Sequence, residues 1–257
     1  MLGRMTMAEK MLLRFSRHPR EVERVPGYVE TSGEWTVDTA LTNYDEAFPS
    51  FREMIRGKRI LDYGCGDGFQ SVAMAKAGAA SVRGVDVALP RLGFGRELSR
   101  EHGFDNVVFG DKIEGEFDLV TTLNAMEHFV EPEKNLREMA AALAPGGKII
   151  ATFGAPWLAP YGAHMMFFSK LPWMNILFSE RTIYRVRSLY RSDGRTTHSP
   201  GMNKMTIKAF ERLVTQCDLE LEAVNYRVVK DLPVLSRLPG IRELFINQID
   251  AIIVPKR

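Results

Sequence analysis

The chain has 257 residues, of which 45% are hydrophobic and 26% charged, and its formal net charge is +2. These values are ordinary for a globular protein, and the small net charge excludes a general affinity for polyanions. Two cysteines, Cys65 and Cys217, are too few for a disulfide framework or a zinc pattern and fit a reducing compartment. The sequence contains no run of 18 or more apolar residues, so no membrane-spanning helix is predicted.

The N-terminal residues MLGRMTMAEKMLLRFSRHPREVER lack the uninterrupted apolar core of a signal peptide, so we expect a cytoplasmic protein. They fit a short basic amphipathic helix with Met7, Met11, Leu12 and Phe15 on one face. Packing of this helix on its own domain is the favoured interpretation. Peripheral contact with a membrane, or docking on a partner, stays open.

From about residue 56 the chain alternates short β runs with helical stretches. We expect strands at RILDYG, SVRGVDV, NVVFGD, FDLVTTLNAM and KIIATFG, and helices at GFQSVAMAKAGA, LPRLGFGRELSREHG and PEKNLREMAAALAPGG. Gly93 and Gly95 weaken the second helix, and Pro-Gly-Gly is expected to end the third. Alternation at this spacing predicts a parallel sheet with helices on both faces.

Regularity breaks between residues 155 and 202, a stretch rich in aromatic residues, proline, methionine and arginine. A helix and a strand follow in TIKAFERLVTQCDLELEAVNYRVV, and FINQIDAIIVPKR supplies a last strand, which predicts an antiparallel edge. We therefore expect four segments: an N-terminal helical segment and cap (1–56), a ligand-binding core (57–154), a helical lid inserted after the fifth strand (155–202), and the C-terminal part of the sheet (203–257). Ligands of open α/β sheets bind at the carboxyl ends of the strands, where the lid would lie.

The stretch ILDYGCGDGFQ places Gly64, Gly66 and Gly68 directly after an apolar run. Such glycines let the chain turn sharply from strand to helix with a ligand against the backbone. A dinucleotide-binding loop needs G-x-G-x-x-G, whereas the spacing here is G-x-G-x-G. Asp62 and Asp67 flank the glycines, and no lysine or arginine is near them in the sequence. An anionic ligand therefore fits poorly, and a cationic or neutral one fits better.

Two further acids follow at the ends of predicted strands. Asp86 comes eighteen residues after Gly68, where a carboxylate can accept hydrogen bonds from both hydroxyls of a ribose. Asp111 ends the third strand, where a carboxylate can accept a hydrogen bond from the amino group of an adenine. A nucleoside without phosphates, carrying a positive sulfonium and an amino acid tail, satisfies all of these features.

The motifs LDYGCGDG, GVDV, GD, FDLVTTLNAMEHF and LAPGGKIIATF resemble, in order, those of the class I S-adenosylmethionine-dependent methyltransferases, most of all the subgroup with a Glu-His pair after the fourth strand. The resemblance runs from about Lys58 to Gly154 and resumes near Thr206–Cys217. It implies a Rossmann-like α/β fold with a seven-stranded, mostly parallel sheet, and S-adenosylmethionine as the cofactor. It also implies donor contacts from Asp62, Gly64, Cys65, Gly66, Asp86, Val87, Asp111, Lys112 and Asn124.

Methyl transfer to oxygen needs a base as well as alignment of the reacting atoms. Glu127 and His128 follow the fourth strand and are candidates, although His128 could instead cap a backbone carbonyl. His164 is the favoured general base because the ordinary pKa of histidine suits proton transfer near neutrality; a hydrogen bond that fixes its loop is the alternative. We expect acceptor contacts from Trp157, Tyr161 and His198.

Some members of the subgroup hold Mg²⁺ through Glu-x-x-Glu-His and a later histidine. The matching residues here are Asn124, Ala125, Met126, Glu127 and His128, so asparagine replaces the first glutamate. Because Mg²⁺ prefers carboxylate oxygens and water, we expect no metal ligand set.

The segment 155–202 has too many apolar side chains for a free loop. The functional interpretation is an apolar acceptor pocket or contact with a lipid surface; the alternative is a lid that packs only on the core. The arginines at 181, 185, 187, 191 and 195 could meet phosphate or carboxylate, or form a solvated face.

We therefore expect a methyltransferase acting on a small or lipid-linked acceptor, most of all at a hydroxyl oxygen of a quinone-type phenol, a sugar or a natural product. Nucleic acid is not an expected partner, because LNAMEHF stands where nucleic-acid enzymes of this fold often carry Asn/Asp-Pro-Pro-Tyr/Phe. A binding or scaffold protein with this fold but no turnover is the remaining alternative. Oligomeric state is not predicted.

Overall fold

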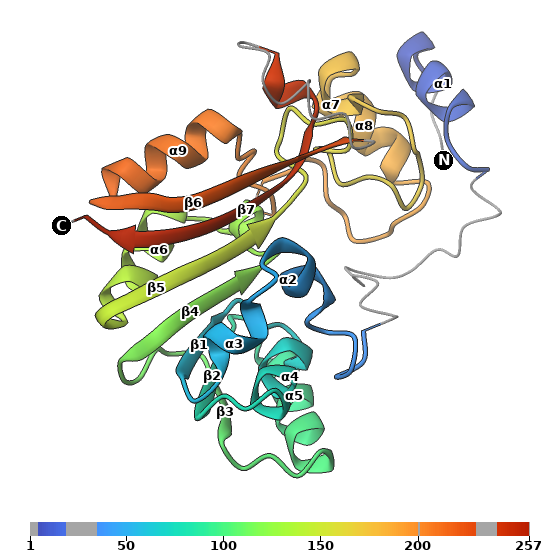
Figure 1. Ribbon diagram of the computed structural model, residues 1–257. Coiled ribbons are helices and arrows are strands. Elements are labelled where there is room, and N and C mark those ends of the chain that lie inside the picture. The colour runs from blue at the N-terminus through green and yellow to red at the C-terminus, as the bar shows by residue number, and fades with distance from the viewer. Residues whose placement is uncertain (1–4, 19–34, 200, 230–240, 257) are drawn as a thin grey trace. The chain divides into compact units, whose positions relative to one another are not determined.

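A single sheet organises the computed structural model, which describes residues 5–18, 35–199, 201–229 and 241–256. Within these residues seven strands follow the order β3-β2-β1-β4-β5-β7-β6, as Figure 1 shows. The strands are β1 Arg59–Tyr63, β2 Ser81–Val85, β3 Val107–Gly110, β4 Phe117–Leu123, β5 Leu143–Phe153, β6 Leu219–Val228 and β7 Ile246–Pro255. Strands β1 to β5 pair in parallel, and β7 is antiparallel to β5. The predicted fold class is confirmed.

The chain forms two compact units. Unit 1 comprises Met1–Gly33, Gly154–Ile207 and Tyr226–Gln248, and unit 2 comprises Glu34–Phe153, Lys208–Asn225 and Ile249–Arg257. This division differs from the four segments expected from the sequence: the residues from 34 to 56 group with the central strands, and those from 226 to 248 group with the insertion.

Helices connect the strands of unit 2 in the expected alternation. They are α2 Thr42–Ala47, α3 Phe51–Ile55, α4 Phe69–Lys76, α5 Leu89–Glu101, the short 3₁₀ helix η2 Met126–His128, α6 Pro132–Ala141 and α9 Ile207–Gln216, the first residue of which groups with unit 1. Side chains of α2 and α3 enter the core, where the rings of Tyr44 and Phe51 are fully buried and stack with centroids 4.4 Å apart. Interior strand residues such as Ile60, Leu61 and Ile150 are also fully buried, as the continuous apolar runs of a parallel sheet require.

The Phe109 ring lies in a slot formed by Gly68, Gly84 and Gly95, which explains one of the two glycines of α5. A Cβ atom added at Gly95 would lie 2.9 Å from this ring, and one added at Gly68 or Gly84 would lie 2.6 Å from it. Phe109 is buried on β3, so three different segments approach it closely enough to exclude any side chain larger than hydrogen. The glycines that weaken α5 in sequence are thus compatible with a helix of 13 residues, because one of them makes room for this ring.

The expected end of the third helix is wrong in detail. Helix α6 ends at Ala141, and the Pro-Gly-Gly that was expected to end it lies inside β5. The register of β5 against β4 shifts there, from Phe117 opposite Leu143 to Leu119 opposite Lys148. Gly146 has a positive φ of 79°, so these residues form an irregularity at the edge of a strand rather than a helix C-terminus.

Unit 1 has its own apolar core. Its helices are α1 Met7–Arg14, α7 Met174–Leu177, α8 Glu180–Arg187 and the 3₁₀ helix η5 Arg242–Leu244, and Figure 1 shows α1 beside α8. The core includes side chains from α1, from α8 and from the insertion, namely Leu12, Ala163, Met165, Phe168, Met174, Phe178, Ile183, Tyr184, Val186 and Tyr190. Turns make up much of the described part of the insertion, in which α7 and α8 are the helices.

Helix α1 packs through one side only. Leu12 is fully buried, and the Glu9 carboxylate pairs with Arg185 of α8 at 3.1 Å. Met7, Met11 and Phe15 are 81%, 52% and 55% exposed, so Leu12 is the one of these four apolar residues that the packing of the helix buries. Among the described residues no helix is both long enough and apolar enough to cross a bilayer.

The Phe109 slot predicts opposite effects for two glycines of one helix. Gly95→Ala should lower the free energy of unfolding by about 1–3 kcal/mol because the new methyl group overlaps the Phe109 ring. Gly93→Ala, with nothing within 4 Å of the added Cβ, should raise it by up to about 1 kcal/mol through helix propensity. Urea denaturation of both variants measures this, and equal effects of the two substitutions would contradict the slot.

Candidate functional site

The predicted donor residues gather at one edge of the sheet in unit 2. Parallel neighbouring strands bring their carboxyl ends to the same edge, and the strand order reverses at β1 and β4. Ligands of this architecture bind at such a reversal. Asp62 lies near the end of β1, and the loops that follow β1, β2, β3 and β4 carry the other predicted residues, namely Gly64, Cys65, Gly66, Asp86, Val87, Asp111, Lys112 and Asn124.

The glycine loop has the backbone that only glycine adopts easily. Gly64, Gly66 and Gly68 have φ values of 78°, 54° and 81°. The backbone N–H groups of Gly64 and Cys65 both donate to the Val85 carbonyl at the end of β2, at 2.8 and 3.1 Å. The bare loop therefore turns tightly beside β2, as the sequence predicted.

Asp86 connects the glycine loop to the loop after β2 through hydrogen bonds. Its Oδ2 accepts the backbone N–H of Gly66 at 2.9 Å, and its Oδ1 accepts that of Ala88 at 2.8 Å. A carboxylate has about four lone-pair positions, so two remain for ribose hydroxyls. Val87, the next residue, is 95% exposed and offers an apolar surface for a flat base.

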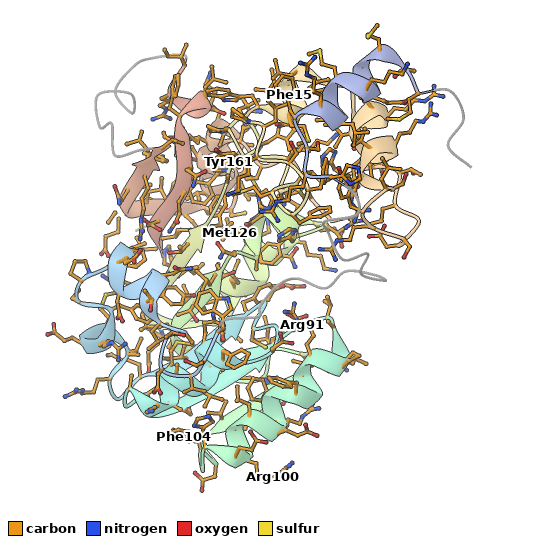
Figure 2. All side chains as sticks on the ribbon, turned by 90° about the vertical axis from the view of Figure 1, so that its right-hand side faces the viewer. Phe15, Arg91, Arg100, Phe104, Met126 and Tyr161 are labelled. Carbon is orange, nitrogen blue, oxygen red and sulfur yellow. The ribbon has the colours of Figure 1, made fainter. Side chains whose placement is uncertain are left out.

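Asp67 of the glycine loop differs from the expectation. Arg91 of α5 donates to Asp67 through Nε and Nη2, at 2.9 and 3.1 Å, so an arginine does offset this acid. The same guanidinium lies 3.2 Å from a Cβ placed on Gly66. Figure 2 labels Arg91 near the start of α5. This pair could not be predicted from the sequence, because Asp67 lies in the glycine loop and Arg91 lies in α5, 24 residues further along the chain.

Asp62 is a buried carboxyl group. It is 2% exposed, accepts a hydrogen bond from Ser71 Oγ at 2.6 Å, and lies 3.4 Å from Thr121 Oγ1. Burial raises the pKa of Asp62 to about 6, against the lowering effect of these two hydroxyl groups. Burial also raises the pKa of the Cys65 thiol, so this cysteine is a packed apolar side chain rather than a reactive thiolate.

The other predicted donor residues are accessible. Asp111, Lys112 and Asn124 are exposed, and the Lys112 carbonyl accepts from Arg83 Nε at 2.9 Å. Asn124 has a positive φ of 50°, and its N–H donates to Thr152 at 2.8 Å, which fixes the end of β4. Glu127 and His128 follow in η2. The backbone and acids of unit 2 therefore fit a nucleoside with a positive sulfonium.

The predicted acceptor residues lie in unit 1. His164 has a positive φ of 53°, and its Nε2 is 3.1 Å from both the backbone nitrogen and the backbone oxygen of Ala155. The backbone N–H of His164 donates to the Tyr161 carbonyl at 2.9 Å. The Trp157 and His198 rings meet edge to face with centroids 4.8 Å apart, so the structure brings these two together.

Comparisons with known proteins define the class. Residues 39–224 match a protein family described as "Methyltransferase domain". Since this match covers more than half of the chain, the protein belongs to that methyltransferase family. The prediction of a class I S-adenosylmethionine-dependent methyltransferase is confirmed.

Individual proteins are similar over different extents. The ubiquinone biosynthesis O-methyltransferase of Bordetella avium (strain 197N) is 36% identical over 107 residues, which are 36% of this chain and 41% of that protein. The chain thus matches less than half the length of this curated relative.

Solved structures share the fold at low sequence identity. The putative S-adenosylmethionine dependent methyltransferase of Listeria monocytogenes has a TM-score of 0.57 and 14% identity, over 86% of this chain and 100% of that one. Magnesium protoporphyrin IX methyltransferase from Synechocystis PCC 6803, with bound SAH, has a TM-score of 0.53 and 15% identity, over 88% of both chains. Likeness at this level establishes the fold alone.

The buried Asp62 predicts a pH dependence of stability. Its folded pKa of about 6 exceeds the ordinary 3.8, so the folded state holds the proton more tightly than the unfolded chain does. The contribution of this group is therefore full at low pH and is lost as the pH rises to about 6. The ionised form above that pH costs on the order of 2 kcal/mol.

Asp62→Asn removes this titration. The free energy of unfolding of the variant minus that of the wild type should increase by about 2 kcal/mol between about pH 4.5 and pH 7.5. Urea denaturation of both proteins at the two pH values measures the difference. A difference that is constant, or that decreases toward pH 7.5, would refute the raised pKa.

Proposed function

We propose that the protein transfers the methyl group of S-adenosylmethionine to a hydroxyl oxygen of a small or lipid-linked acceptor, with a quinone-type phenol as the leading candidate. The similarity to a ubiquinone biosynthesis O-methyltransferase carries this choice of acceptor. The fit of the glycine loop and Asp86 to a nucleoside supports the donor.

Unit 2 supplies the donor side of the proposal. Asp86 would accept the ribose hydroxyls with the lone pairs that Gly66 and Ala88 leave, and Asp111 would accept from the adenine amino group. Val87 would cover a face of the base, with further contacts from Asp62, Gly64, Cys65, Lys112 and Asn124. When bound, S-adenosylmethionine supplies an electrophilic methyl group on a sulfonium.

Unit 1 would supply groups for the acceptor, among them Trp157, Tyr161 and His198. An oxygen nucleophile must lose its proton, and His164, His128 and Glu127 stay the predicted candidates for that base. The backbone contacts of His164 Nε2 with Ala155 favour the alternative for this residue, in which it holds its own loop. No step of the proposal uses a metal ion.

The experiment that tests the proposal joins donor binding to transfer. Calorimetric titration with S-adenosylmethionine should show binding to the wild type. Asp86→Ala should weaken this binding by more than about 100-fold, because the variant loses the proposed hydrogen bonds from the two ribose hydroxyls and the hydrogen bond from the Gly66 N–H group. Labelled methyl groups should appear on a catechol that carries a farnesyl chain, with or without EDTA. Asp105→Ala, an exposed acid near β3, is the control and should bind and transfer like the wild type.

Three results would each remove a part of the proposal. Unchanged affinity in Asp86→Ala would overturn the donor site. Donor binding without transfer to any phenol, sugar or lipid extract would favour a scaffold protein. Transfer to RNA or DNA instead would favour a nucleic-acid methyltransferase.

We also propose that unit 1 contacts a membrane surface, where a lipid-linked acceptor would be found. Met7, Met11 and Phe15 recur every four residues along α1 and are exposed, and Lys10 and Arg14 lie between them. Figure 2 shows Phe15 at the end of this helix. Apolar side chains with basic neighbours favour the surface of anionic lipids.

Sedimentation with vesicles tests this contact. The wild type should bind vesicles of phosphatidylcholine and phosphatidylglycerol, and Met11→Ser with Phe15→Ser should weaken binding more than about tenfold through lost apolar burial. Val108→Ser, an exposed apolar residue of unit 2, is the control. Equal binding of the double variant and the wild type would contradict a role for α1.

A further inference from the structure

An ion pair lies beside the proposed donor site in unit 2. Arg91, in the first turn of α5, donates from Nε to Asp67 Oδ1 at 2.9 Å and from Nη2 to Asp67 Oδ2 at 3.1 Å. Both side chains are partly accessible, with exposed fractions of 33% for Arg91 and 21% for Asp67. The pair is therefore at the surface of the donor loops rather than in the core of the sheet.

Gly66 connects this ion pair to the proposed ribose acceptor. The backbone N–H of Gly66 donates to Asp86 Oδ2 at 2.9 Å, and a Cβ atom built on Gly66 would lie 3.2 Å from the Arg91 guanidinium. The next residue in the chain, Asp67, binds that same guanidinium. The carboxylate proposed for the ribose hydroxyls and the cation of Arg91 therefore both lie against one glycine of the loop.

The charges of these side chains act on the middle of the glycine loop. Burial is the main cause of the raised pKa of the Cys65 thiol; the charges of Asp62 and Asp86 raise this pKa further, and that of Arg91 lowers it. An arginine close enough to act on Cys65 would also attract an anion that is placed against the loop. Asp67 opposes this attraction, because its carboxylate is bound to the same guanidinium.

Recognition of the nucleoside alone does not select the methyl donor. Adenosine phosphates carry the same base and the same ribose hydroxyls as S-adenosylmethionine, so the contacts proposed for Asp86, Val87 and Asp111 would accept both. The two kinds of ligand differ at the 5′ carbon, where the donor has a sulfonium cation and a nucleotide has an anionic phosphate. A guanidinium binds phosphate through two parallel hydrogen bonds, which is the geometry in which Arg91 holds Asp67.

We propose that Asp67 is a specificity-determining residue that excludes 5′-phosphorylated nucleosides from the donor site. Its carboxylate takes the place on Arg91 that a phosphate would take, and its negative charge repels that phosphate. The inference rests on the proposed donor site in unit 2 and needs no group from unit 1. It also explains why an anionic ligand fits this site poorly, as the sequence indicated, although an arginine lies against the loop.

The test compares adenosine with adenosine 5′-monophosphate, because these two probes differ only in the phosphate. The wild type should bind adenosine at least about tenfold more tightly than the monophosphate. Asp67→Asn keeps the size of the side chain and removes its charge. This variant should bind the monophosphate about tenfold or more tightly than the wild type does, and its affinity for adenosine should stay within a few-fold of the wild type. Calorimetric titration measures both affinities.

Control variants separate the effect of charge from that of loop structure. Asp67→Asn combined with Arg91→Gln should lose the gain for the monophosphate, because the guanidinium that would bind the phosphate is absent. Asp105→Asn and Arg100→Gln, which change an exposed acid and an exposed arginine of unit 2, should bind both probes like the wild type. The gain in Asp67→Asn should decrease when NaCl is raised from about 50 to 500 mM, whereas adenosine binding should not change.

The monophosphate decides the inference whether or not methyl transfer is found. A wild type that binds the monophosphate as tightly as adenosine, or an Asp67→Asn variant that gains no affinity for it, would overturn the role of Asp67. Equal losses for both probes in this variant would also overturn it, because they would show that the ion pair only holds the loop. A wild type that does not bind S-adenosylmethionine, together with a gain for the monophosphate in Asp67→Asn, would refute the proposed donor and support the exclusion of anions by Asp67.

Discussion

The two backbone hydrogen bonds to Asp86 are the constraint on which the donor side of unit 2 depends. One carboxylate oxygen holds the N–H of Gly66, and the other holds that of Ala88. The loop after β1 and the loop after β2 are therefore held together by one side chain, and about two lone-pair positions of the carboxylate remain. A single side chain thus shapes the loop and also presents the acceptors that a nucleoside needs. Because one carboxylate does both, an acid at the end of a strand and at this distance from the glycines is an informative feature of the sequence.

The sequence was most informative where the structure is set by neighbours in the chain. Strand-to-helix turns, the glycine spacing and Asp86 all follow from local patterns, and the family resemblance placed them in order. Pairs that form across segments were missed, such as Asp67 with Arg91 and Glu180 with His198, because each needs two helices or loops to be packed before its atoms can meet. The end of α6 was wrong for a related reason: Pro-Gly-Gly is equally compatible with a helix end and with a strand irregularity, and the pairing of β5 with β4 decides between them.

The acceptor side is harder to derive because unit 1 has little regular structure to guide an interpretation. The abundance of apolar residues between 155 and 202 correctly indicated a packed segment rather than a free loop. Most of these side chains fill the core that the insertion shares with Leu12 of α1, while Met166, Ile176 and Leu177 stay between 46% and 61% exposed. Polar groups in such a core are expensive unless they are paired. The buried His198 ring meets this requirement at Nδ1, which lies 2.8 Å from Glu180 Oε1.

The slot around Phe109 has a consequence for how such a chain can change over time. Gly68, Gly84 and Gly95 come from three segments, yet each is restricted by the same ring. A smaller side chain at position 109 would remove this contact from all three positions, but Gly68 would stay restricted by its φ of 81°, and a Cβ at Gly84 would still lie 3.0 Å from Cys65 Sγ. Gly95 is restricted by the ring alone, so a substitution there should follow a change of the phenylalanine. The donor loop, which contains Gly68, inherits this dependence on a residue that lies two strands away from it in the sheet.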